Sequence, residues 1–233
     1  MNGQAKTPLL ILAGGQGTRL RTLEPHRPKP MIVVGGKPFL HWLIAHYERL
    51  GHRDFILSTG YKAEVIEEHP WSKDFLDCSF RFSRELTPLG TGGAVKAIFA
   101  ELKLSKAWVI NGDTLLPQPL PSVKPGIEAL YSVLEENKLF DATPNLHVKD
   151  EHITDEGPQG RYFDAGATFL TQKALDRYRG GVPCSLHQVL KSAMEAGQVG
   201  YAVMPGTCYD IGTPERFKRF EQYLSSPAHS EEI

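Results

Sequence analysis

The stretch of residues 9–31, LLILAGGQGTRLRTLEPHRPKPM, decides the fold class of this chain. It begins with four apolar residues and Ala13, a composition typical of a strand buried on both faces of a parallel sheet. A glycine-rich turn with Gly14, Gly15 and Gly17 follows at once. Because glycine has no Cβ, a ligand can approach this backbone closely, and successive N–H groups can donate to phosphate oxygens.

Two cations follow the turn. Arg19 comes two residues after the last glycine, and Lys29 stands between Pro28 and Pro30. Two cations close to a row of backbone N–H donors indicate a site that binds a polyphosphate. The P-loop pattern does not fit, because GGQGTRL lacks its GK[ST] ending, and the dinucleotide fingerprint requires a glycine where Leu20 stands. The alternative is a structural turn with solvated cations.

Length and charge limit the class of protein. A chain of 233 residues is long enough for one sizeable core. With 26 Lys and Arg against 27 Asp and Glu, it offers no electrostatic case for nucleic acid or an anionic membrane. Three widely spaced cysteines lack metal-ligand spacing, and neither a membrane span nor a signal-peptide core is evident, so we expect reduced thiols and a cytoplasmic location.

Hydrophobic periodicity predicts alternating strands and helices. Residues 39–50 have helical spacing, and residues 54–58 form a second short apolar run, which together with the first strand indicates a right-handed parallel unit. The remaining patterns predict strands at 79–83, 108–111, 127–134, 145–148, 162–170, 199–203 and 207–211, and helices at 94–102, at 186–195 and from Pro214 onward, with Thr213 as N-cap. We therefore predict an α/β fold: a Rossmann-like, mostly parallel sheet flanked by helices.

Four further sites contain residues suited to ligand binding. The turn ELTPLGTGGA at 85–94 is rich in glycine, which suits either a ligand or tight packing. Asp113 follows a central strand, at the edge where open α/β sheets bind ligands, although strand-end aspartates also cap turns. Asp210 lies near the end of a strand, where the alternative role is to shape the turn into the last helix, and for Asp164 the alternative is a solvated edge residue.

The string LAGGQGTRL followed by PKPM and GKPFL resembles the signature of the sugar-1-phosphate nucleotidyltransferases. The resemblance implies an enzyme that joins a sugar 1-phosphate to a nucleoside triphosphate and releases pyrophosphate, on a fold like that of the A-type glycosyltransferases. It also implies one domain over residues 1–225, with a nucleotide-binding half at about 1–115 and a small sugar-binding extension at about 116–225. The polar tail 226–233 is expected to be disordered.

The resemblance also assigns roles to residues. Arg19, Lys29 and Asp113 are the expected catalytic residues, and Asp113 and Asp210 are the expected ligands of Mg²⁺, which prefers carboxylate oxygens. The expected nucleotide-binding residues are Leu12, Ala13, Gly14, Gly15, Gly17, Thr18, Glu85, Gly90, Thr91 and Gly92, and the expected sugar-binding residues are Asn111, Asp164 and Gly166. The turn-rich segment 136–161 suits a hairpin over the mouth of the site.

Substrate identity is less constrained. The phrases GKPFL, GYKAEVI, PLGTGGA and NGDT resemble the D-glycero-α-D-manno-heptose 1-phosphate guanylyltransferases, which implies GTP and that heptose phosphate. The chain lacks the Glu-Lys pair and the Tyr-Gly of many members, and its shortened middle resembles the N-acetylmuramate 1-phosphate uridylyltransferases, so UTP with that sugar or another hexose 1-phosphate is an alternative. A non-catalytic nucleotide-sugar sensor is a third hypothesis. The pattern leaves monomer or homo-oligomer open.

Overall fold

The computed structural model describes residues 7–15, 27–135 and 143–226. The chain divides into two compact units, one made of residues 1–86, 111–115 and 209–233 and the other of residues 87–110 and 116–208. The predicted positions Gly17, Thr18 and Arg19 lie outside the described residues, and so does the predicted tail beyond Ser226. The predicted division of the domain near residue 115 stays a prediction.

The first unit is built on three parallel strands. β1 (Leu9–Leu12) pairs with β4 (Asp54–Thr59), and β4 pairs with β5 (Ser79–Arg84). The helix α1 (Phe39–Arg49) lies between β1 and β4 in the sequence, as the pattern predicts. Every residue of β1 and β4 that is apolar is buried or half-buried, because both faces of the strands are covered.

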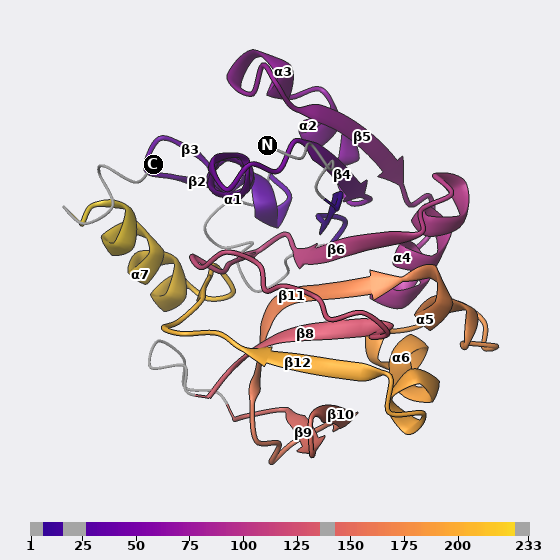
Figure 1. The fold of residues 1–233 in the computed structure, drawn as a ribbon. Coiled ribbons are helices and arrows are strands. Elements are labelled where there is room, and N and C mark those ends of the chain that lie inside the picture. Colours follow the sequence, from indigo (N-terminus) through magenta and orange to yellow (C-terminus); the bar gives the residue numbers. More distant parts are fainter. Residues whose placement is uncertain (1–6, 16–26, 136–142, 227–233) are drawn as a thin grey trace, which may run out of the picture. The chain divides into compact units, whose positions relative to one another are not determined.

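Helices and short strands complete this unit (Figure 1). The short elements are the 3₁₀ helix η2 (Lys29–Met31), strands β2 (Val33–Val34) and β3 (Lys37–Pro38), helices α2 (Ala63–Glu67) and α3 (Trp71–Asp74), and strands β7 (Thr114–Leu115) and β13 (Tyr209–Asp210). The last helix, α7 (Pro214–Leu224), begins at its predicted residue, where Thr213 Oγ1 accepts from the backbone N–H of Arg216 at 3.3 Å. Its Phe220 is fully buried against Phe39 of α1, with ring centroids 4.8 Å apart.

The second unit contains a mixed sheet in the order β6-β11-β8-β12-β10-β9. Its strands are β6 (Lys106–Asn111), β8 (Ala129–Leu134), β9 (Leu146–Lys149), β10 (His152–Glu156), β11 (Phe163–Thr171) and β12 (Val199–Val203). β11 is antiparallel to both neighbours, and β10 is antiparallel to β12 and β9, so the other four strands share one direction. β9 and β10 form a hairpin within the segment where one was predicted.

Three helices belong to this sheet: α4 (Gly90–Glu101), α5 (Gln172–Asp176) and α6 (Leu186–Glu195) (Figure 1). α6 has the predicted bounds, and Ser185 and Gln188 close its N-terminus with a capping box. α4 begins four residues before its predicted start, within the glycine turn. The cause is tertiary: the backbone N–H groups of Gly92 and Gly93 donate to the carbonyl oxygen of Cys184, at 2.9 and 3.3 Å.

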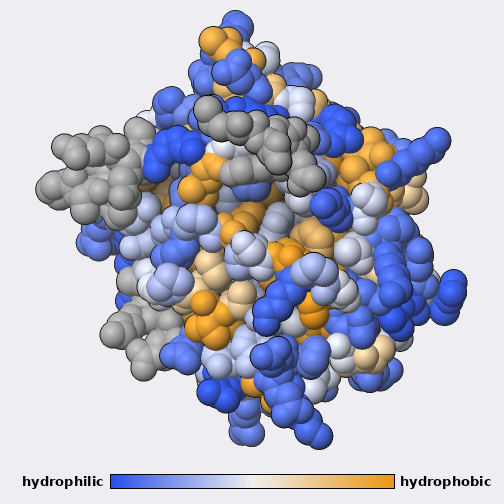
Figure 2. All heavy atoms as spheres, viewed as in Figure 1, coloured by the Kyte–Doolittle hydropathy of each residue, from blue (hydrophilic) through white to orange (hydrophobic). Residues whose placement is uncertain are grey.

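Burial follows the predicted pattern, because the apolar residues of the strands and the inner helix faces form the core. Hydrophilic residues are interspersed with hydrophobic ones over the face in Figure 2. None of the described helices combines the length and the apolar character needed to cross a membrane. Strands alternating with helices around a sheet confirm the predicted α/β class.

Candidate active site

The loop that carries Asp113 is held against the first strand. β6 ends at Asn111, which is exposed, and the backbone N–H of Gly112 then donates to the carbonyl oxygen of Leu12 at 3.0 Å. A Cβ on Gly112 would collide with that oxygen and would lie 3.3 Å from the Cα of Ala13. This contact fixes Asp113 beside the start of the glycine-rich turn.

The second predicted metal ligand lies next to the first. β13 is antiparallel to β7 and places Asp210 opposite Thr114, and the backbone N–H of Ile211 donates to the carbonyl oxygen of Asp113 at 3.1 Å. The structure therefore brings the backbones of two aspartates that are far apart in the sequence next to each other. The strand predicted at 207–211 is shorter than expected, but it includes Asp210.

Lys29 joins this pair. It is the first residue of η2, after Pro28, and its ammonium forms a salt bridge with Oδ2 of Asp113. Oδ1 of Asp113 accepts from the hydroxyl of Thr114 at 3.1 Å. The Lys29 side chain is 16% exposed and that of Asp113 is 35% exposed, so solvent and a ligand can reach the carboxylate.

Arg216 also belongs to this cluster, although no sequence pattern predicted it. Its Nη1 donates to Oδ2 of Asp210 at 3.0 Å, while Oδ1 of Asp210 accepts from the backbone N–H of Gly212 at 2.6 Å. Arg216 stands in the first turn of α7, where the helix dipole disfavours a cation. That local mismatch in TPER is the sequence signal that could have pointed to it.

The described part of the glycine-rich turn is tied to the neighbouring strands. Ala13 N–H donates to Ser58 at 2.8 Å, and the carbonyl oxygen of Gly14 accepts from Tyr61 N–H at 3.2 Å. The carboxylate of Glu85 lies so close that a Cβ on Gly14 would be 2.9 Å from Oε1. Two predicted nucleotide-binding residues are thus adjacent.

Gly15 is exposed, and a Cβ there would meet no atom of the described residues within 4 Å. Open space beside an exposed backbone is what a phosphate ligand needs in order to reach the amides.

The other predicted nucleotide-binding turn, Gly90 to Gly92, lies in the second unit. Besides the Gly92 bond to Cys184, Thr91 Oγ1 accepts from the backbone N–H of Leu186 at 3.0 Å. A Cβ on Gly92 would lie 2.6 Å from Cγ2 of Val189. These contacts show that tight packing requires the glycine, whatever further role the turn has.

Asp164 and Gly166 form a bulge in β11. The pairing of β11 with β8 shifts register after Asp164, Gly166 adopts a φ of +79°, and its N–H donates to Oδ1 of Asp164 at 2.8 Å. Burial raises the pKa of Asp164 to about 6, while the Gly166 bond opposes this shift and the nearby Glu156 adds to it. A carboxylate with a raised pKa inside the sheet is a feature of functional sites.

The carboxylate oxygens of the site suit a divalent cation whose remaining coordination positions are filled by other ligands. Among the described residues, no group of three or more His, Cys, Asp or Glu side chains is placed to hold a metal ion. Asp113 and Asp210, whose backbones lie side by side, supply two carboxylates, and Mg²⁺ is usually bound by one or two carboxylates together with water and substrate phosphates. The pair therefore suits an ion that arrives with a phosphate ester.

A glycine turn after the first strand, with a lysine and two carboxylates beside it, defines an α/β protein that handles phosphate esters. Residues 9–124 match the family described as "Nucleotidyl transferase". The chain belongs to this family, as its sequence signature predicts. Its activity is nucleotidyl transfer to a sugar 1-phosphate, and enzymes of the family generally use a divalent metal ion.

The chain is 28% identical to the D-glycero-α-D-manno-heptose 1-phosphate guanylyltransferase of Campylobacter jejuni, over 91% of this chain and 97% of that protein. It is 29% identical to the mannose-1-phosphate guanylyltransferase of Mycobacterium tuberculosis, over 90% of this chain and 62% of that protein. The crystal structure of HddC from Yersinia pseudotuberculosis complexed with GMP-PN matches with a TM-score of 0.79 and 28% identity, covering 94% of this chain and 100% of that one.

Proposed function

We propose that this protein transfers the guanylyl group of GTP to D-glycero-α-D-manno-heptose 1-phosphate with the aid of Mg²⁺, releasing pyrophosphate. The observation that carries the reaction type is the cluster of Lys29, Asp113 and Asp210 beside the glycine-rich turn. The choice of base and sugar is supported by the similarity to heptose 1-phosphate guanylyltransferase over nearly its whole length.

The chemistry requires no general base on the protein. A phosphate oxygen of the sugar 1-phosphate, already ionised near neutral pH, forms the new bond to the α-phosphorus, and the bond to the pyrophosphate oxygen breaks. The protein's task is to bring two anions together and to stabilise the charge that develops on the leaving group.

The described residues divide this task between them. Asp113 and Asp210 would hold the divalent cation, which when bound neutralises phosphate charge. Lys29 supplies a compact positive charge beside the reacting phosphates, and the open backbone at Gly15 offers amide donors. Arg19 is proposed to stabilise the pyrophosphate, because its planar fork matches phosphate oxygens.

Sugar recognition is assigned to Asn111, Asp164 and Gly166. The raised pKa of Asp164 supports this assignment, because a half-buried carboxylate that loses part of its hydration has a cost that sugar hydroxyls could offset by hydrogen bonding. A cytoplasmic location is also proposed, since Cys78, Cys184 and Cys208 are free thiols and nucleoside triphosphates are cytoplasmic substrates.

The experiment is pyrophosphate release from five nucleoside triphosphates crossed with heptose, mannose, glucose, N-acetylglucosamine and N-acetylmuramate 1-phosphates, with Mg²⁺ or with EDTA. We expect release with GTP and the heptose phosphate, abolished by EDTA. Preference for UTP and the N-acetylmuramate phosphate would overturn the assignment of substrates. Triphosphate binding without release from any pair would replace the enzyme by a nucleotide-sugar sensor.

Variants test the site itself. Asp113→Asn and Lys29→Ala should each lower kcat by at least about a hundredfold, because each removes charge from the reacting centre. The exposed charges Asp77 and Lys73 provide the matched controls, Asp77→Asn and Lys73→Ala, which should leave kcat unchanged.

A further inference from the structure

Every carboxylate oxygen of the two proposed metal ligands already accepts a hydrogen bond from the protein. Asp113 accepts from Lys29 and from the Thr114 hydroxyl. Asp210 accepts from Arg216 and from the backbone N–H of Gly212. Each carboxylate therefore has one full positive charge beside it, and the four charged side chains sum to zero.

The stability of α7 does not account for an arginine at position 216. It occupies the third helical position of α7, where the N-terminal end of the helix dipole repels a cation and where a Glu or Gln would complete a capping box with Thr213. Its guanidinium is 26% exposed and the Asp210 carboxylate is 14% exposed, so this ion pair is shielded more than a surface pair. A residue that opposes a local preference in this way marks a functional position.

We propose that Arg216 is a positioning residue of the active site: it holds the Asp210 carboxylate in the metal-free protein and lowers the affinity of the site for a free divalent cation. This inference rests on the proposed role of Asp210 as a metal ligand. Lys29 and Arg216 already neutralise the two carboxylates, so the carboxylates alone bind a free cation weakly. A divalent cation should therefore bind tightly only when a triphosphate supplies further negative charge.

Coulomb's law gives the scale of the effect. At the dielectric constant of water, one positive charge roughly 6 Å from a divalent ion reduces its affinity by about tenfold. Partial burial of Asp210 lowers the effective dielectric constant, so tenfold is the lower bound. Lysine in place of Arg216 keeps the charge, whereas glutamine keeps a hydrogen-bond donor and removes the charge.

The test is Mn²⁺ binding to the full chain, followed by electron paramagnetic resonance, with and without a GTP analogue carrying a methylene group between the α- and β-phosphorus. Arg216→Gln should bind free Mn²⁺ at least about tenfold more tightly than the wild type, and Arg216→Lys should match the wild type. The control is Arg219→Gln, which removes an exposed charge from the same helix. Thermal unfolding of each variant checks that it is folded.

Unchanged or weaker Mn²⁺ binding by Arg216→Gln would overturn the proposal, and so would equally tight binding by the Lys and Gln variants, because then charge is not the cause. A different result would contradict the proposed function. If Asp210→Asn and Asp113→Asn leave Mn²⁺ binding in the presence of the GTP analogue unchanged, these residues are not the metal ligands, whatever the Arg216 variants do.

Discussion

The backbone N–H of Gly112 donates a hydrogen bond of 3.0 Å to the carbonyl oxygen of Leu12. This bond joins the residue before Asp113 to the end of β1, directly before the glycine-rich turn. The position of Asp113 relative to that turn therefore depends on a contact that leaves no room for a side chain.

Gly112→Ala should lower kcat by about a hundredfold, because the new Cβ forces Asp113 away from the Leu12 strand and a misplacement of about 1 Å has such a cost. Steady-state kinetics with saturating substrates measures the effect. The matched control is Gly181→Ala, where a Cβ meets no atom within 4 Å in the described part of the chain, and it should retain wild-type kcat. Near-normal turnover by Gly112→Ala would show that the loop tolerates displacement.

Glu128→Gln should destabilise the fold at neutral pH by about 2 to 3 kcal/mol. The Glu128 carboxylate is 3% exposed and accepts from Arg177 at 2.6 and 2.8 Å, and Lys173 lies 2.9 Å away. The hydrogen bonds from Arg177 lower the pKa of Glu128 to about 2.

The direction of this pH dependence follows from the difference between the pKa of Glu128 in the folded chain and in the unfolded chain. The folded pKa of Glu128 is below the unfolded value, so its contribution is fully present above about pH 4.5 and is lost as the pH falls toward 2. Urea unfolding at pH 7 and pH 3 should show the full difference in unfolding free energy between wild type and variant at pH 7 and about half of it or less at pH 3. Glu151→Gln, which alters an exposed pair with Lys124, should show no difference at either pH.

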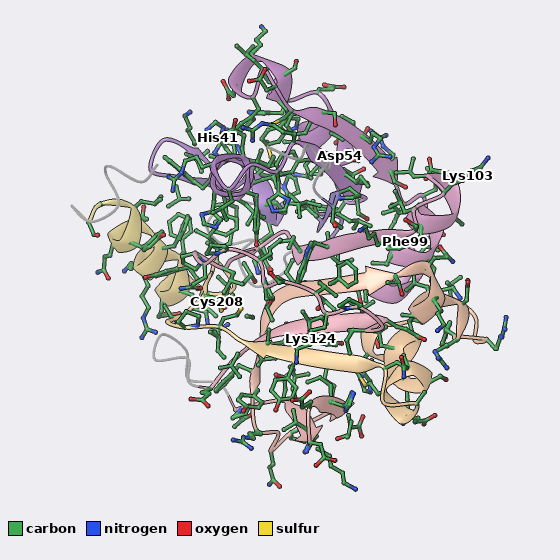
Figure 3. All side chains as sticks on the ribbon, viewed as in Figure 1. His41, Asp54, Phe99, Lys103, Lys124 and Cys208 are labelled. Atoms are coloured by element: carbon green, nitrogen blue, oxygen red, sulfur yellow. The ribbon has the colours of Figure 1, made fainter. Side chains whose placement is uncertain are left out.

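His41 should make the first unit less stable in mild acid. It lies buried on α1 (Figure 3), with Nε2 2.8 Å from the Lys37 ammonium and Nδ1 3.3 Å from the Asp74 carboxylate. Burial, followed by the charge of Lys37, lowers the pKa of His41 to about 4. The unfolded chain therefore binds a proton between pH 6.5 and 4 that the folded chain does not bind.

The free energy of unfolding is therefore not reduced by His41 above pH 6.5. Protonation of His41 in the unfolded chain should lower it by about 2 kcal/mol between pH 7 and pH 5. Urea midpoints of the wild type and of His41→Gln, measured across that range, test the prediction, with His147→Gln on β9 as control. A His41→Gln profile as steep as that of the wild type would assign the acid sensitivity to other groups.

Asp164→Asn should raise thermal stability at pH 7 to 8 and raise KM for the sugar 1-phosphate. The folded pKa of Asp164, about 6, is above the unfolded value, so the ionised carboxylate is disfavoured in the fold above that pH. Asparagine removes the charge and keeps an oxygen for the Gly166 N–H. Greater stability with unchanged KM would remove Asp164 from the proposed sugar site.

Local sequence predicted the elements well where a signal lies within one turn or strand. α6 has its predicted bounds, and Thr213 with Pro214 places the start of α7, because capping is a contact between residues three apart. The start of α4 was misplaced. Its first N–H groups bond to Cys184, a residue that no local pattern connects to the turn.

The candidate site shows the same division. The motifs predict Asp113 and Asp210 as candidate metal ligands, whereas no motif points to Arg216, because its partner lies across a turn and its effect opposes the helix preference.

The sequence by itself determined the α/β class and the family, since strand and helix periodicity and a glycine-rich signature are properties of neighbouring residues. Only the tertiary structure decided that Lys29 pairs with Asp113, that Asp210 lies beside it and that Arg216 neutralises Asp210. These relationships join residues distant in the chain, and they depend on how strands pair and helices pack, which local spacing does not encode.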